Sequence, residues 1–94
     1  MLILGKDKII AAYQSHSEWK AALERWVTTV ESAKWKFPTD VRQTYNSADP
    51  VGQYVVFDIQ HNKCRLISVI NYQLGTVLVD AVVSHTEYDS MKLK

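Results

Sequence analysis

Two stretches rich in β-branched residues, residues 64–72 and 76–83, constrain the fold of this chain more than any other feature. Only residues 73–75 separate them, and a short break containing a glycine between two such stretches indicates a hairpin turn. A loop of three residues would pair Tyr72 with Thr76 beside the turn. We therefore expect an antiparallel hairpin in the C-terminal half of the chain.

The expected hairpin is apolar on both faces, because hydrophobic side chains occupy both alternating positions, as Leu66 and Ile67 do in its first strand. Strands of this kind lie in the middle of a sheet whose two faces are both largely covered. The helices that the chain can supply cover only one face. We expect the other face to form, at least in part, a groove wall or the contact surface of a partner.

The remaining segments predict an α+β domain, in which two N-terminal helices pack on a small, mainly antiparallel sheet. Apolar side chains recur at intervals of three and four across residues 19–30, which is the stripe of an amphipathic helix. Ser15 or Ser17 would cap this helix, and Thr39 would cap a later helical turn. The expected elements are a strand at residues 2–4, helices at 6–14 and 17–33, a helical turn at 40–45, a loop at 46–52, a strand at 54–59, the hairpin and a polar tail from residue 85. We expect residues 1–94 to form a single domain.

Composition limits the cellular locations and the binding partners that we expect for the protein. The apolar runs are far too short to cross a bilayer, and the first residues lack the basic start of a signal peptide. Cys64 is the only cysteine, so an internal disulfide is excluded and a reducing cytoplasm is expected. The formal net charge of +1 gives none of the basic excess that is typical of proteins binding nucleic acid through its phosphates.

One end of the expected hairpin gathers residues suited to cleaving an RNA phosphodiester. Pairing of Arg65 with Val83 would place His85 on the same side as Arg65, with Tyr88 one turn further on. A guanidinium binds phosphate oxygens in pairs, and an imidazole gains or loses a proton near neutral pH. Arg65 would stabilise the charge of the transition state, while His85 and Tyr88 would share proton transfer without a metal or other cofactor. The residues leave open which of His85 and Tyr88 is the acid and which is the base. In an alternative role, Tyr88 would stack on a nucleobase of the RNA.

Three other basic residues are candidates for contacts with RNA. Lys63 precedes Arg65 in the turn and would hold a backbone phosphate. Lys36 and Arg42 belong to a region where basic and aromatic residues alternate, as they do in segments that contact RNA. The alternative is that this region is a connector whose aromatic side chains pack against the sheet.

Each catalytic candidate also has a purely structural interpretation. Arg65 would form an ion pair with Asp58 or Glu87, His85 would be an ordinary loop residue, and Tyr88 would anchor the tail by packing.

The remaining histidines do not indicate a metal site. His16 and His61, taken with Cys64, lack the spacing of metal ligands, so we expect no bound metal.

Several motifs occur in an order and spacing that resemble the HigB toxins, a branch of the RelE/ParE superfamily of bacterial toxin–antitoxin systems. They are Asn62-Lys63-x-Arg65-Leu66-Ile67, Ile70-Asn71-Tyr72, His85-x-Glu87-Tyr88-Asp89, Trp35-Lys36-x-Pro38-x-Asp40 and Tyr54-Val55-Val56-Phe57-x-Ile59. The resemblance implies a RelE-type α+β fold and ribosome-dependent cleavage of messenger RNA in the ribosomal A site. It also implies a HigA-type antitoxin protein that binds and neutralises the toxin.

The chain departs from the family pattern at four positions. Asp80 stands where a basic residue is usual and Ser90 where lysine is frequent, while His61 replaces a glycine and Cys64 an aromatic residue. The first two changes reduce the positive charge available to a polyanion. They allow an alternative in which the chain is a catalytically attenuated toxin homologue that acts as an antitoxin-binding, regulatory module.

Overall fold

The computed structural model describes residues 1–61 and 63–91, and it shows an α+β fold built on a five-stranded sheet in the order β1-β5-β4-β3-β2. The strands are β1 (Leu2–Leu4), β2 (Asp49–Val51), β3 (Tyr54–Ile59), β4 (Cys64–Asn71) and β5 (Thr76–Ser84). Neighbouring strands are antiparallel except β1 and β5, which run parallel. The prediction of a mainly antiparallel sheet joined by residues 2–4 is confirmed.

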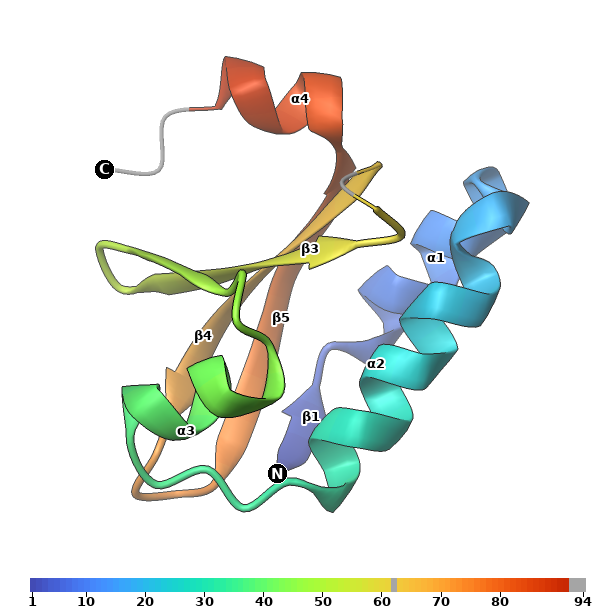
Figure 1. Cartoon of the computed structure of the whole chain (residues 1–94). Helices are drawn as coiled ribbons and strands as arrows, with labels where there is room; N and C mark the ends of the chain where they lie inside the picture. The colour runs from blue at the N-terminus through green and yellow to red at the C-terminus, as the bar shows by residue number, and fades with distance from the viewer. Residues whose placement is uncertain (62, 92–94) are drawn as a thin grey trace.

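The helices gather mostly on one side of this sheet. They are α1 (Lys6–Ser15), a 3₁₀ turn η1 (Ser17–Trp19), α2 (Lys20–Ser32), α3 (Pro38–Thr44) and α4 (His85–Ser90). Figure 1 shows α1 and α2 next to each other along the sheet, while α4 stands at the far end of β5, apart from α2 and α3. Among the described residues, no helix combines the length and the apolar character needed to cross a membrane.

The core lies between the sheet and the two N-terminal helices. Leu23 and Trp26 of α2 and Phe57 of β3 are buried in one cluster, and the rings of Trp26 and Phe57 meet edge to face with centroids 5.4 Å apart. The other buried members of this core include Ile3, Ile9, Trp19, Val30, Trp35, Val41, Leu66, Val77 and Val79. The apolar stripe predicted for the second helix is therefore the face that α2 buries.

Helix starts differ from the sequence prediction. Neither His16 before η1 nor Trp19 before α2 caps its helix through a side chain, so capping by Ser15 or Ser17 was wrong. Ser15 is instead the last residue of α1, which continues directly into the 3₁₀ turn after His16.

The third helix begins at Pro38 and not at residue 40. Proline suits the first helical position, because it has no N–H to leave unpaired and its φ is already helical. The Oδ2 atom of Asp40 accepts hydrogen bonds from the backbone N–H groups of Lys36 and Phe37, at 2.8 and 3.1 Å. Asp40 thus stabilises this helix start, and the prediction of a Thr39 cap was wrong.

Two segments predicted without regular structure have it. Part of the expected loop at residues 46–52 forms β2, in which Pro50 pairs with Val55 of β3. The expected polar tail begins with α4, while residues 92–94 lie outside the described part of the chain.

The turn of the β4–β5 hairpin is one residue longer than predicted. Asn71, and not Tyr72, pairs with Thr76, so residues 72–75 form the loop. The Asn71 side chain accepts a hydrogen bond from the backbone N–H of Leu74 at 3.0 Å, and Gly75 takes a left-handed φ of 71°. An Asx-type contact and a glycine together close this longer turn.

A β-bulge at Asp80 restores the predicted register further along the hairpin. Ile67 lies opposite Ala81 and Ser68 opposite Val79, so Asp80 is the extra residue. Beyond the bulge, Arg65 pairs with Val83 as predicted. The bulge thereby compensates for the extra residue of the loop.

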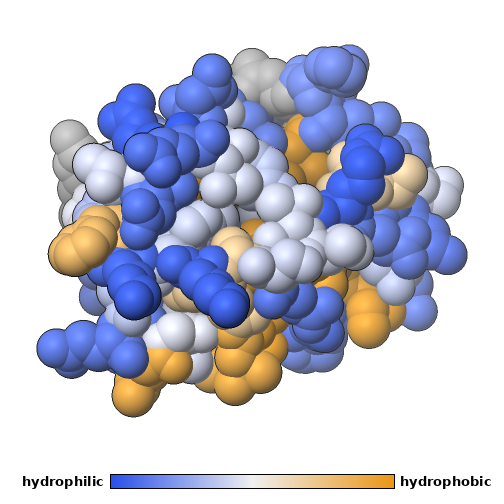
Figure 2. Space-filling view, turned by 60° about the horizontal axis from the view of Figure 1, so that its bottom comes forward, coloured by the Kyte–Doolittle hydropathy of each residue, from blue (hydrophilic) through white to orange (hydrophobic). Residues whose placement is uncertain are grey.

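The face of the sheet away from α1 and α2 is only partly covered. Val56 and Ile67, which are paired on this face, are buried, whereas Leu2, Leu4 and Leu78 are exposed near the β1 edge. Figure 2 shows the surface at the lower end of the molecule, where hydrophobic side chains form separate patches between hydrophilic ones.

Candidate active site

Arg65 occupies the first part of β4 and projects from the sheet face opposite the helical layer. Its side chain is only 9% exposed, and its Nε atom lies 2.9 Å from Oδ1 of Asp58. Asp58 is the residue paired with Arg65 on β3, so the sheet register itself brings the two charges together. A buried guanidinium requires such a partner, because removing its charge from water is otherwise costly. The predicted Arg65–Asp58 ion pair is therefore present.

His85 begins α4 and contacts Arg65 directly. Its Nδ1 atom lies 2.9 Å from Nη2 of Arg65, and its Nε2 atom lies 3.3 Å from Oδ2 of Asp89, one helical turn later. The two residues that the sequence placed on one side of the hairpin are thus in hydrogen-bond contact. The imidazole remains accessible to a ligand, because 48% of the His85 side chain is exposed.

Tyr88 completes this group from the same helix. The guanidinium of Arg65 lies over its ring, 5.6 Å from the centroid, which is a cation–π contact. Partial burial raises the pKa of the Tyr88 phenol, the negative charge of Asp49 raises it further, and Arg65 acts in the opposite direction. The phenol therefore stays protonated at neutral pH and is a potential proton donor.

A capping box holds α4 in this position. Oγ of Ser84 accepts a hydrogen bond from the Glu87 backbone N–H at 3.1 Å, and Oε1 of Glu87 accepts one from the Ser84 N–H at 3.0 Å. These hydrogen bonds lower the pKa of the Glu87 carboxyl. The sequence pattern Ser-x-x-Glu is a known mark of a helix start, and it would have predicted α4.

A cavity of about 330 Å³ adjoins Arg65 and Tyr88. Buried Val56 contributes to its apolar lining, and Arg42, Asp49 and Asp58 add charged groups. Arg42, one of the three other basic residues predicted to contact RNA, therefore lies at the Arg65 site. Asp49 and the neighbouring polar residues 46 and 47 carried no chemical motif in the sequence, so only the fold identifies them.

The other two predicted RNA contacts lie in different places. Lys63 is exposed next to α4, since its carbonyl oxygen accepts a hydrogen bond from the His85 backbone N–H at 3.1 Å. Lys36 instead lines a hollow with Tyr72 and Gly75, at the turn end of the hairpin. In the same connector Trp35 is buried in the core while Phe37 is exposed, so only one of its two aromatic rings packs as the structural interpretation predicts.

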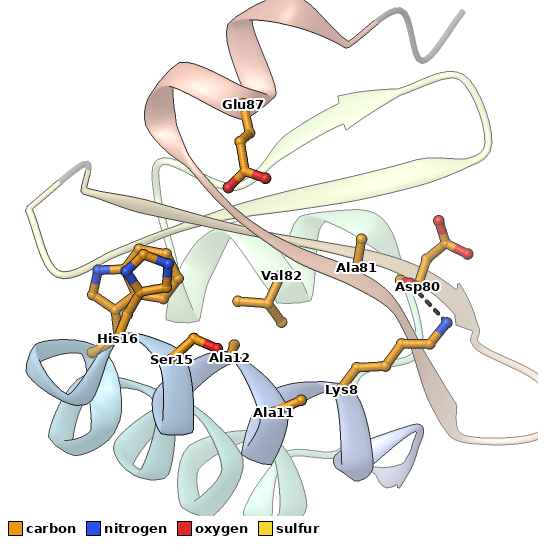
Figure 3. Close-up of a pocket in the computed structure, with 10 residues that line it drawn as sticks. Lys8, Ala11, Ala12, Ser15, His16, Asp80, Ala81, Val82 and Glu87 are labelled. Atoms are coloured by element: carbon orange, nitrogen blue, oxygen red, sulfur yellow. Dashed lines mark hydrogen bonds between the residues drawn. The ribbon is translucent and has the colours of Figure 1, made fainter.

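Asp80 lies away from the Arg65 cavity. Figure 3 shows it in a separate pocket of about 400 Å³ between α1 and β5, with Glu87 extending toward the same space from α4. Lys8 donates a hydrogen bond from Nζ to the backbone carbonyl of Asp80 at 2.8 Å. His16 is at the opposite end of this pocket, stacked on Trp19 with ring centroids 3.8 Å apart.

The described residues, 1–61 and 63–91, contain no group of three or more His, Cys, Asp or Glu side chains arranged to hold a metal ion. The side chains at the site itself supply a guanidinium, an imidazole, a phenol and the carboxylates beside them.

One comparison with known proteins identifies a relationship. The model of the HigB toxin family, described as the RelE-like toxic component of a toxin–antitoxin system, matches residues 19–91. The matched region contains β2 to β5, α3 and α4, and thus every residue of the site described above. No curated protein sequence matches the chain.

Proposed function

The chain belongs to the family of HigB toxins, the RelE-like toxic components of toxin–antitoxin systems, and from this premise we propose that it is a metal-independent endoribonuclease that cleaves messenger RNA in the ribosomal A site. The observation that carries the proposal is the direct contact of the Arg65 guanidinium with the His85 imidazole on one side and with the ring of Tyr88 on another. The cavity beside Arg65 and Tyr88, with Arg42 on its wall, offers space for part of a nucleotide.

The proposed reaction is attack by a ribose 2′-oxygen on the adjacent phosphate. A base removes the 2′-OH proton as the bond to phosphorus forms, and the bond from phosphorus to the 5′-oxygen breaks. Arg65 stabilises the negative charge that develops on the phosphate oxygens, through hydrogen bonds that a guanidinium can make in pairs.

The two proton transfers are assigned to different groups. His85 is the base, because its Nδ1 atom faces a guanidinium, which has only donors, and is therefore an acceptor nitrogen. Tyr88 is the acid, because its raised pKa keeps the phenol protonated and able to donate a proton to the leaving 5′-oxygen. Lys63 and Arg42 bind flanking phosphates, and Lys36, at the other end of the hairpin, contacts a more distant part of the RNA or of the ribosome.

The partners follow from the family and the proposed substrate. Membership of a toxin–antitoxin family implies an antitoxin protein, which we propose is of the HigA type. The ribosome positions the message, and residues 1–94 act as one domain in the cytoplasm.

Induced expression in a bacterial host without antitoxin, followed by mapping of new 5′ ends across cellular messages, tests the proposal. Growth arrest with cuts inside translated reading frames is expected. Arg65→Ala combined with His85→Ala should abolish both effects in a protein whose circular dichroism is unchanged. A folded double variant that still arrests growth would overturn the site assignment.

A second function is favoured by one observation, the near-complete burial of the Arg65 side chain at 9% exposure. A toxin homologue that retains this ion-paired arginine for structure alone would bind antitoxin without cleaving RNA. Absence of growth arrest from the soluble, folded protein, together with tight binding to its antitoxin, is the result that identifies this function.

A further inference from the structure

The imidazole of His85 is held between two charged groups of opposite kind. Nη2 of Arg65 lies 2.9 Å from Nδ1, and Oδ2 of Asp89 lies 3.3 Å from Nε2. A guanidinium has N–H donors and no acceptor. Nδ1 must therefore be the accepting nitrogen, which leaves the ring proton of the neutral imidazole on Nε2, the nitrogen that lies 3.3 Å from Oδ2 of Asp89.

This arrangement occupies the nitrogen that a base requires. In the RNA-free protein the lone pair of Nδ1 is engaged by Arg65, so it cannot accept a proton from a ribose hydroxyl. A protonated imidazole would place its Nδ1–H against a guanidinium N–H, two donors facing each other. The contact therefore selects one tautomer and keeps its basic nitrogen covered.

Asp58 fixes the opposite edge of the same guanidinium. Its Oδ1 atom lies 2.9 Å from Nε of Arg65, and the carboxylate stands on β3 directly across from Arg65. Because Asp58 on β3 binds Nε, the Nη2 end of the guanidinium is the part that can change its hydrogen-bond acceptor. This end lies next to the partly exposed side chain of His85. The ring of Tyr88 covers the guanidinium and limits other directions of approach.

We propose that Asp58 and Asp89 are positioning residues that make the base at this site available only when phosphate is bound. An RNA phosphate oxygen replaces Nδ1 of His85 as the acceptor for Nη2 of Arg65, while Asp58 retains Nε. Nδ1 is then free to take the proton of the 2′-OH, and Asp89 stabilises the imidazolium that results. The proton moves from the 2′-oxygen to Nδ1, and Tyr88 supplies the proton that leaves with the 5′-oxygen. This inference rests on the proposed endonuclease function and adds an order of events to it.

The first test is nitrogen-15 NMR of the histidine side chains in the full-length protein. His85 is expected to be the neutral Nε2–H tautomer with a hydrogen-bonded Nδ1. A fully 2′-O-methylated RNA hexamer at millimolar concentration lacks the nucleophile, and it should shift the Nδ1 resonance toward that of an unbonded nitrogen. The spectra of His85→Gln and His61→Gln assign the signals. An Nδ1–H tautomer, or an Nδ1 resonance that RNA leaves unchanged, would overturn the proposal.

The second test separates positioning from folding by the steady-state kinetics of messenger RNA cleavage on ribosomes. Asp58→Ala should lower kcat by about 100-fold with little change in KM, which is the loss expected when a reacting group is displaced by roughly 1 Å. Asp58→Asn should recover most of the rate, because its amide oxygen still accepts from Nε–H. Glu31→Ala, which removes the Lys6–Glu31 ion pair away from the site, is the matched control and should cleave normally.

The outcomes distinguish this inference from the proposed function. Normal cleavage by Asp58→Ala would refute the positioning role while leaving the endonuclease intact. The expected NMR spectrum from a wild-type protein that cuts no message would refute both the catalytic role given to Nδ1 and the proposed function.

Discussion

The thiol of Cys64 lies fully buried at the start of β4, next to Arg65 in the chain. Burial raises its pKa to about 12, compared with an ordinary value of 9.0, and the positive charge of Arg65 offsets only part of this effect. A thiol in this environment stays neutral and unreactive under physiological conditions. Cys64 thus acts in this core as a small hydrophobic side chain.

The raised pKa of Cys64 predicts a loss of stability in alkali. Below pH 9 the thiol is neutral in both states, so its contribution is fully present; between pH 9 and about 12 it ionises only in the unfolded chain, which favours unfolding. The free energy of unfolding should fall over this range by roughly 2–4 kcal/mol more than in Cys64→Ala, which has no thiol. Urea denaturation of both proteins at pH 8 and pH 11 measures the difference. Equal losses would show that the thiol does not titrate as its burial indicates.

At the scale of elements, α4 depends on its cap. None of its residues is buried, so little hydrophobic packing holds His85 and Tyr88 over Arg65. The reciprocal hydrogen bonds between Ser84 and Glu87 supply the missing constraint.

Ser84→Ala should therefore impair the site more than the fold. Loss of a serine cap costs about 1 kcal/mol, and here it would act on a short terminal helix. We expect a slower rate of message cleavage and faster amide exchange in residues 85–90, with a nearly unchanged thermal midpoint. Ser90→Ala, which removes the Ser90 hydroxyl hydrogen bond to the Thr86 carbonyl at the other end of α4, is the control. If both variants cleave equally well, the cap does not position the catalytic side chains.

The β3–β4 turn carries strain that a glycine would remove. Gln60 and His61 both have a φ of 52°, in the left-handed region, which glycine adopts without strain. His61→Gly should stabilise the protein by up to about 1 kcal/mol, net of the extra freedom of glycine in the unfolded chain. Gln53→Gly, in a turn where φ is not positive, should destabilise it. Thermal melts that rank the two variants in the opposite order would contradict this account of the turn.

How much of the structure the sequence could predict varies from element to element. The spacing of apolar residues predicted α2 and the two hairpin strands. The predicted pairing of Arg65 with Val83 placed His85 close to Arg65. Both predictions succeed because they depend on the spacing of residues within short segments. The Asp80 bulge and the four-residue turn could not be predicted separately, since their effects on register cancel. Arg42 and Asp49 meet Arg65 only because α3 and β2 pack beside it, which is a tertiary fact that no local pattern contains.

At the scale of the whole molecule, charges of both signs are mixed over the surface, and the Arg65 cavity itself combines Arg42 and Arg65 with Asp49 and Asp58. The formal net charge is +1, and acidic Asp80 and Glu87 line the pocket between α1 and β5, away from the Arg65 cavity. Asp80 therefore lowers the overall attraction for a polyanion without standing in the place of a catalytic cation. Such a charge distribution gives a weak long-range electric field around the protein, which fits the proposal that the ribosome positions the substrate.

This charge distribution predicts weak, weakly salt-dependent binding to isolated RNA. Three phosphate contacts, from Arg65, Arg42 and Lys63, would make the logarithm of the association constant fall with log salt at a slope of about −2 for single strands. Asp80→Arg should steepen the slope by roughly 1 and increase affinity at low salt, while leaving the cleavage positions on translated messages unchanged. Fluorescence anisotropy between low and physiological salt gives the slopes, and 5′-end mapping gives the positions. A wild-type slope near −5 would show that the protein grips RNA over a much larger basic surface, and altered cleavage positions in Asp80→Arg would place Asp80 against the message after all.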